Sequence, residues 1–127
     1  MKEINSIGIV KPKIFKCVDP IKLSCGMTLD NYKLIYETYG KLNKNKDNAV
    51  LVCHALSGNQ HVAGRHKKTD KHPGWWDSLV GPGKPLNTNK FFVIGINNLG
   101  GNEGSTGPKS INPKTKKVWG SSFPIIT

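Results

Sequence analysis

The sequence predicts an α/β domain with a largely parallel sheet, of which this chain is the front part. Two continuous apolar runs, AVLVCHAL at 49–56 and KFFVIGINN at 90–98, are typical of strands buried on both faces. Such strands need helices on both faces, yet the chain shows almost no helical periodicity. Its two long loops, residues 57–89 and the stretch after Asn98, exceed the roughly 15 residues usual in a compact domain. We therefore expect the covering helices and remaining strands to follow Thr127.

The earlier elements are predicted from alternation and turn residues. Residues 1–20 show no clear period. The segment IKLSCGMTLDNYKLIYETYG at 21–40 is typical of a hairpin, with a turn at Cys25–Met27 and a strand over Tyr32–Tyr39. One face of that strand carries Leu34, Tyr36 and Thr38, and the other carries Lys33, Ile35 and Glu37. The charged run at 41–48 is a turn, and one short helix is expected near Trp76–Val80.

The net charge of +11 raises the possibility of a nucleic-acid partner. Of the 19 basic residues only Arg65 is arginine, whereas base readout favours arginine, and no lysine run is interleaved with aromatic residues. The lysines are therefore interpreted as solvated loop residues whose positive field attracts an anionic substrate such as a nucleotide thioester. A basic, non-catalytic binding module remains an alternative, and it would bind nucleic acid in a salt-sensitive way.

The composition is that of an ordinary soluble domain, with 36% hydrophobic and 21% charged residues. No run approaches the roughly 18 apolar residues of a membrane span, and the charged N-terminus lacks the apolar core of a signal peptide. We therefore expect a cytoplasmic protein without a membrane partner. Three cysteines, Cys17, Cys25 and Cys53, match no disulfide or zinc spacing, and Cys53 is expected to be a small apolar filler in a strand.

Four motifs follow one another in a characteristic order: HALSGNQHVAG, GWWDSLVGPGKPLNTNKFFVI, NNLGG and GSTGPKSINP. In order and spacing they resemble the homoserine O-acyltransferases, which are α/β-hydrolase-fold enzymes of methionine biosynthesis. The resemblance covers roughly residues 20–127. One departure is Asn102, because family members usually carry a cysteine directly after the paired glycine of NNLGG.

The resemblance implies a reaction between an acyl-CoA and L-homoserine that yields O-acyl-L-homoserine and CoA. Overall likeness favours succinyl-CoA over acetyl-CoA as donor, with the acyl-CoA as a co-substrate and no cofactor. It also implies a homodimer for the full-length enzyme. Another hydrolase of the same fold is the remaining alternative, which the GWWD and GSTGP motifs disfavour.

The resemblance implies the N-terminal part of an α/β-hydrolase fold, comprising the first strands of the central sheet. Residues 1–19 would be an N-terminal extension, and residues 20–127 a domain truncated before the nucleophile elbow. The Ser-His-Asp triad of this fold places its serine in a G-x-S-x-G elbow, which the sequence lacks, because Gly104–Gly107 has the wrong spacing. The helix before the elbow would begin near Thr127, so the chain alone is expected to be inactive.

One catalytic group is expected within the chain. Hydrolase-fold enzymes take one oxyanion-hole N–H from the loop after the first buried strand, and by resemblance this donor is the backbone N–H of Leu56. The imidazole of His54, at the end of that strand, is interpreted as shaping the turn, because no acidic partner is near it in sequence.

Other polar and aromatic residues are interpreted structurally. Trp75 and Trp76 are expected to anchor the core. Ser57, His61 and His66 are not expected to be hydrolytic residues, and the histidine spacing with its basic flank predicts no metal site. The glycine loops at 100–107 match no phosphate-binding motif and are interpreted as tight turns at the active-site entrance.

Overall fold

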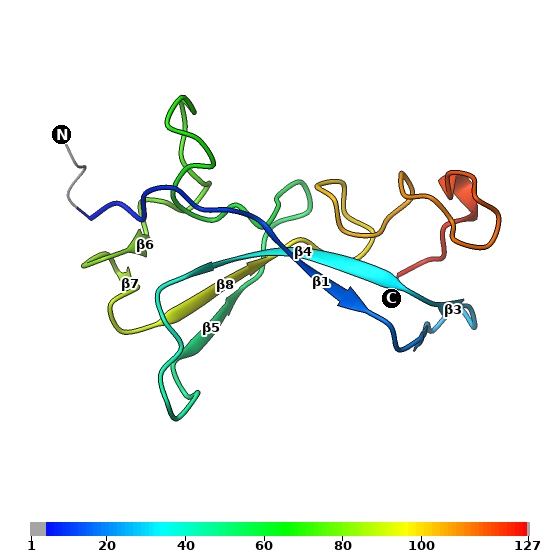
Figure 1. Ribbon diagram of the computed structural model, residues 1–127, viewed down its shortest axis with the longest axis horizontal. Helices are drawn as coiled ribbons and strands as arrows, with labels where there is room; N and C mark the ends of the chain where they lie inside the picture. Colours follow the sequence, from blue (N-terminus) through cyan, green and yellow to red (C-terminus); the bar gives the residue numbers. More distant parts are fainter. Residues whose placement is uncertain (1–4, 127) are drawn as a thin grey trace. The chain divides into compact units, whose positions relative to one another are not determined.

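The computed structural model describes residues 5–126, which form eight strands and one short 3-10 helix (Figure 1). The main sheet has the order β1-β4-β8-β5. Its strands are β1 (Lys13–Cys17), β4 (Tyr32–Tyr39), β8 (Phe92–Ile96) and β5 (Ala49–Val52). β8 pairs antiparallel with β4 and parallel with β5. The two apolar runs thus form the expected parallel pair within a mixed sheet.

The smaller elements lie outside this sheet. β2 (Ile21–Lys22) and β3 (Thr28–Leu29) form an antiparallel hairpin whose turn contains Gly26 at a φ of +84°. The turn lies where the sequence predicts it, but the strand expected to follow it in the hairpin, Tyr32–Tyr39, pairs in the main sheet instead. β6 (Val80–Gly81) and β7 (Leu86–Asn87) pair in parallel, and the 3-10 helix η1 spans Gly120–Ser122.

The expectation of a short helix near Trp76–Val80 is wrong. The segment before Val80 forms consecutive turns, in which the Trp76 carbonyl accepts bonds from the Leu79 and Val80 N–H groups. Val80 then enters β6 directly, and Pro82 follows it. Because nucleating a helix costs more than its first hydrogen bond returns, so short a segment does not propagate.

The chain divides into two compact units. The first contains the chain through Lys13 together with Tyr36–Ile96, and the second contains Ile14–Ile35 together with the chain from Asn97 onward. The first unit holds the hydrophobic core, whose buried members are Val10, Tyr39, Val52, Val62, Ala63, Val80 and Val93. These residues come from three strands of the main sheet, from β6 and from loops, and burial of their apolar surface stabilises the unit.

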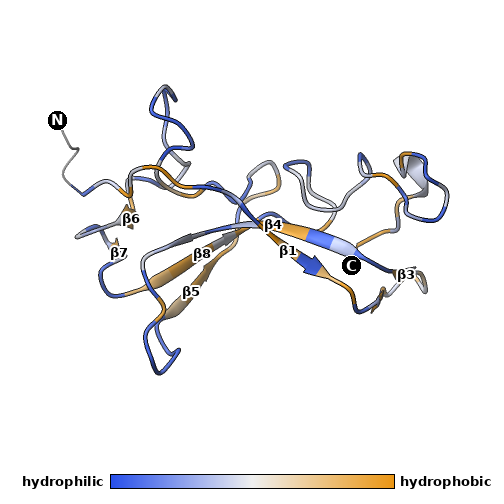
Figure 2. Cartoon of the chain, in the orientation of Figure 1, coloured by the Kyte–Doolittle hydropathy of each residue, from blue (hydrophilic) through white to orange (hydrophobic). Residues whose placement is uncertain are grey.

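Only one face of the sheet around β8 is covered by the described residues. Glu37 pairs with Gly95 and Gly95 with Val52, and the first and last of these side chains are buried. On the other face Leu51 is 58% exposed, although Figure 2 colours β5 and β8 as hydrophobic. No helix among the described residues covers this face, which agrees with the expectation that the covering helices follow Thr127.

Cys53 also departs from expectation. β5 ends at Val52, so Cys53 follows the strand and is exposed, and it is not an apolar filler. Among residues 5–126, no helix is long and apolar enough to cross a membrane. The helix start expected near Thr127 lies outside the described residues.

Candidate active-site loop

A β-turn follows β5 and presents the backbone of Leu56. The Gly58 N–H donates to the Ala55 carbonyl at 2.8 Å, which closes the turn around Leu56 and Ser57. The Leu56 side chain is fully exposed, and its N–H has no acceptor among residues 5–126. An unused N–H at the end of a parallel strand is the group that the sequence predicts as an oxyanion-hole donor.

His54 precedes this turn and shapes it. Its Nδ1 lies 2.6 Å from the Ala55 carbonyl oxygen, and a β-carbon on Gly58 would lie 2.8 Å from the His54 β-carbon. The imidazole is therefore engaged with the local backbone, which agrees with the turn-shaping role predicted for it. The absence of a side chain at Gly58 permits this close approach.

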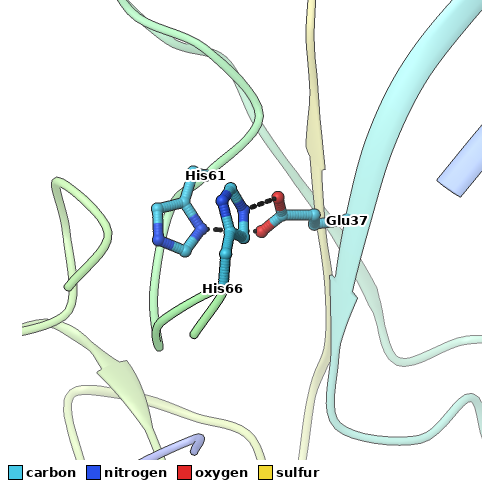
Figure 3. Close-up of side chains that lie close together, drawn as sticks. All are labelled: Glu37, His61 and His66. Atoms are coloured by element: carbon cyan, nitrogen blue, oxygen red, sulfur yellow. Dashed lines mark hydrogen bonds and ion pairs between the residues drawn. The ribbon is translucent and has the colours of Figure 1, made fainter. Parts of the chain in front are cut away.

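The continuation of the loop brings two histidines onto one buried carboxylate. Figure 3 shows His61 and His66 pointing at Glu37 on β4. His61 Nδ1 lies 2.9 Å from Glu37 Oε2, and His66 Nε2 lies 2.7 Å from Glu37 Oε1. The two rings are 3.8 Å apart between centroids, and the Glu37 side chain is fully buried. Sequence spacing could not reveal this cluster, because Glu37 is separated from both histidines by more than twenty residues.

The protonation of the cluster follows from its contacts. Burial raises the pKa of the Glu37 carboxyl, but hydrogen bonds from His61, His66 and Tyr39 outweigh burial and lower that pKa below its ordinary value. Burial, with the Glu37 charge beside it, raises the pKa of Tyr39. The carboxylate is therefore ionised at neutral pH and accepts bonds from three protonated donors.

Tyr39 joins the same cluster to the loop backbone. Its hydroxyl donates to Glu37 Oε2 at 2.8 Å and accepts the Val62 N–H at 2.9 Å, and the Gln60 carbonyl oxygen lies 3.2 Å from it. Two residues before His61 in the chain, the Asn59 side chain accepts a hydrogen bond from the His61 N–H at 2.9 Å. The loop is thus hydrogen-bonded to β4 through a carboxylate and a phenol.

Glu37, His61 and His66 are also a set of residues that metals use, since their ligand atoms lie within 4.8 Å of one another. Two donor atoms bound to one tetrahedral zinc are about 3.3 Å apart, given zinc–nitrogen bonds of about 2.05 Å. The nitrogen–oxygen contacts of 2.7 and 2.9 Å are shorter than this and match charge-assisted hydrogen bonds. The geometry therefore favours a hydrogen-bonded cluster, and the absence of a metal stays a prediction.

The tryptophans of the GWWD motif are less buried than expected. Trp75 and Trp76 remain 41% and 42% exposed, so the expectation that they anchor the core is wrong for the described residues. The Trp75 indole instead donates to the Asn59 carbonyl at 3.0 Å, and Asp77 accepts the Gly64 N–H at 2.7 Å. This motif supports the loop through polar contacts.

The glycine loops of the second unit are tight turns, as predicted. The Gly101 N–H donates to the Asn98 carbonyl at 2.9 Å, which closes a turn with Gly100 at a φ of +84°. Ser105 Oγ accepts the Ile35 N–H and donates to the Asn97 carbonyl. Ser105 is buried and held by backbone groups, so it has a structural role. The second unit also contains a cavity of about 530 Å³, lined in part by Lys16, Lys33 and Lys109, that the sequence analysis did not anticipate.

The mixed sheet, with β8 antiparallel to β4 and parallel to β5, fits the first strands of an α/β-hydrolase fold, and the likeness to solved structures of that fold shows the class of protein. The solved structure of homoserine O-acetyltransferase from Bacillus anthracis has a TM-score of 0.86 and is 42% identical, with 94% of this chain and 33% of that one covered. Esterase E22 has a TM-score of 0.86 at 38% identity, with 94% of this chain and 34% of that one covered.

Curated protein sequences with a higher identity to this chain carry a more specific name. A homoserine O-succinyltransferase from Cellvibrio japonicus (strain Ueda107) is 58% identical over 122 residues, 96% of this chain and 32% of that protein. One from Pseudomonas putida (strain GB-1) is 56% identical over 124 residues, 98% of this chain and 33% of that protein. No family model matches. The chain is similar to these homoserine O-succinyltransferases and spans about a third of their length.

Proposed function

We propose that the protein containing this chain transfers an acyl group from an acyl-CoA to the hydroxyl of L-homoserine, in methionine biosynthesis. The observation that carries this is the 58% identity to a homoserine O-succinyltransferase over 96% of the chain. Succinyl-CoA is the favoured donor, because curated relatives at 56–59% identity are named homoserine O-succinyltransferase. Acetyl-CoA is the other candidate, supported by the solved acetyltransferase at 42% identity.

The chemistry is a two-step acyl transfer. A serine outside this chain attacks the thioester carbonyl, CoA leaves as the thiol, and the homoserine hydroxyl then takes the acyl group from the serine. In each step the former carbonyl oxygen carries negative charge in the tetrahedral intermediate. The chain's contribution is the Leu56 N–H, which donates a hydrogen bond to that oxygen and stabilises it more than it stabilises the ground state.

The remaining attributes of the full-length protein are expectations. They are a cytoplasmic location, a homodimer, no cofactor, and no nucleic-acid or membrane partner. The scarcity of arginine in a chain of +11 net charge supports the expectation about nucleic acid. Fluorescence anisotropy with labelled DNA at low salt tests it, and tight salt-sensitive binding would support the alternative of a basic binding module.

Ester hydrolysis is the second candidate function, and the likeness to esterase E22 supports it. In a hydrolase water accepts the acyl group from the serine, so homoserine is not needed.

One experiment separates the two candidates. Thiol release from succinyl-CoA and acetyl-CoA by the full-length protein is measured with and without L-homoserine. Release that requires homoserine supports acyl transfer, and the faster donor identifies the acyl group. Homoserine-independent release, together with cleavage of p-nitrophenyl esters, would establish a hydrolase and contradict the first proposal.

A further inference from the structure

The loop that carries Leu56 is fastened to β4 by two neighbouring side chains on one face of that strand. We infer that Glu37 and Tyr39 are positioning residues for acyl transfer, which hold the loop of residues 55–66 so that the Leu56 N–H stays directed at the acyl oxygen. This inference rests on the proposed function and assigns these residues a part in the same site.

A series of hydrogen bonds connects β4 to the loop as far as the turn around Leu56. Tyr39 holds the Val62 N–H at 2.9 Å, and Glu37 holds the His61 ring at 2.9 Å. Asn59, two residues earlier, bonds the His61 N–H through its side chain and the Trp75 indole through its carbonyl. The closed turn around Leu56 follows immediately on the N-terminal side, so little freedom remains between the fastened residues and the proposed donor.

An ionised carboxylate suits this task better than a neutral group. It accepts hydrogen bonds from three donors at once, here His61, His66 and Tyr39, without offering a competing N–H. Its full burial keeps water from competing for these bonds and strengthens them. A displacement of about 1 Å in a reacting group lowers the rate roughly a hundredfold. A rigidly held loop therefore keeps the rate of acyl transfer high.

The side chains that face Glu37 define how a substitution there acts. They are His61 and His66 from the loop and Tyr39 from β4, while Gly95, opposite on β8, contributes no side chain. Glutamine at position 37 keeps the shape of glutamate, but its amide NH₂ replaces one acceptor oxygen with a donor, so it does not accept hydrogen bonds from all three groups at once.

The test uses the full-length protein with Glu37→Gln and Tyr39→Phe. Both variants are expected to lower kcat at least about tenfold and leave KM for the acyl-CoA unchanged, because the loop positions a transition-state donor.

The matched control is Asp77→Asn. It removes another carboxylate that accepts a hydrogen bond from this loop, but from the Gly64 N–H, which lies farther along the chain from Leu56 than His61 does. It is expected to lower Tm with little change in kcat. If all three variants lose activity in proportion to their loss of Tm, the role of Glu37 and Tyr39 is merely structural and the inference is overturned.

A second measurement does not depend on activity. Amide hydrogen exchange of residues 55–66 is expected to accelerate in Glu37→Gln and Tyr39→Phe, while exchange in β5 and β8 stays at the wild-type rate. Unchanged loop exchange would overturn the inference even in an active enzyme. Accelerated exchange of the wild-type loop on adding a chelator would also overturn it, because a metal would then hold the cluster. If the wild-type protein shows no acyl transfer, the proposed function is contradicted separately. The hydrogen-exchange measurement still shows whether Glu37 and Tyr39 hold the loop.

Discussion

A β-carbon built on Gly95 would lie 2.5 Å from the carbonyl oxygen of Gln60. Gly95 pairs with Glu37 on one side and with Val52 on the other, so the missing side chain leaves a gap in the covered face of the sheet. The loop fills this gap, and the Val62 side chain lies equally close to the same point. The glycine thereby lets the loop approach near enough for Glu37 and Tyr39 to bond it.

Gly95→Ala is expected to destabilise the protein by roughly 1–3 kcal/mol, the usual cost of overpacking, because the loop backbone must move away. The midpoint of urea unfolding measures this loss. Gly26→Ala is a comparison, since a β-carbon there meets no atom within 4 Å and its cost comes only from the φ of +84°. An unchanged midpoint for Gly95→Ala would contradict the close approach.

If the proposed function holds, Leu56→Pro is expected to lower kcat of the full-length protein by about 100- to 1,000-fold, because proline deletes the N–H proposed as an oxyanion-hole donor. Leu56 is the second residue of a β-turn, where proline is favoured, so the fold should survive. Steady-state rates of thiol release measure the effect. Leu56→Ala keeps the N–H and should be mild, and equal damage from both changes would mean that Leu56 acts through its side chain.

Stability is expected to fall in acid. The pKa values of Glu37 and Asp77 are lowered in the folded state, in both cases because hydrogen bonds outweigh the opposing effect of burial. In the unfolded chain these groups have ordinary pKa values near 4.3 and 3.9. At pH values between these and the lowered pKa values of the folded state, the unfolded chain therefore binds more protons than the folded protein does. This stabilisation is fully present above about pH 5 and is lost as the pH falls through the lowered values.

Urea unfolding at a series of pH values measures this dependence. Glu37→Gln, which cannot titrate, should give a shallower fall in unfolding free energy between about pH 5 and 3 than the wild type. A fall as steep as that of the wild type would show that Glu37 has an ordinary pKa in the folded protein.

The chain of 127 residues by itself is expected to lack acyl transfer and to associate with itself. β5 is at the end of the sheet order, so its outer edge has no partner strand among the described residues, and Leu51 beside it is 58% exposed. Apolar edge strands of this kind template aggregation. Light scattering, hydrophobic-dye binding and thermal melting measure this; a monomer with a sharp transition and no dye binding would contradict it.

Three strands of the main sheet, β4, β5 and β8, were predictable because their signals are local, whereas β1 lies within residues 1–19, which show no clear period and were expected to be an extension outside the domain. Alternation over Tyr32–Tyr39 and the apolar runs that contain β5 and β8 depend only on neighbouring residues and the strand period. The turn near Gly26 is local for the same reason. The expected helix near Trp76 failed because a few helix-compatible residues do not outweigh the adjoining short strand and proline.

The sequence by itself determined the apolar strands, the turn that follows β5 and the motifs that resemble those of homoserine O-acyltransferases, since each depends on residues close together in the chain. Only the tertiary structure decided that Glu37 meets His61 and His66, because antiparallel pairing of β4 with β8 places that carboxylate opposite a glycine. It also decided which face of the sheet is covered. Contacts between residues more than twenty apart are set by strand register and by the space a missing side chain leaves, and neither is written in a local pattern.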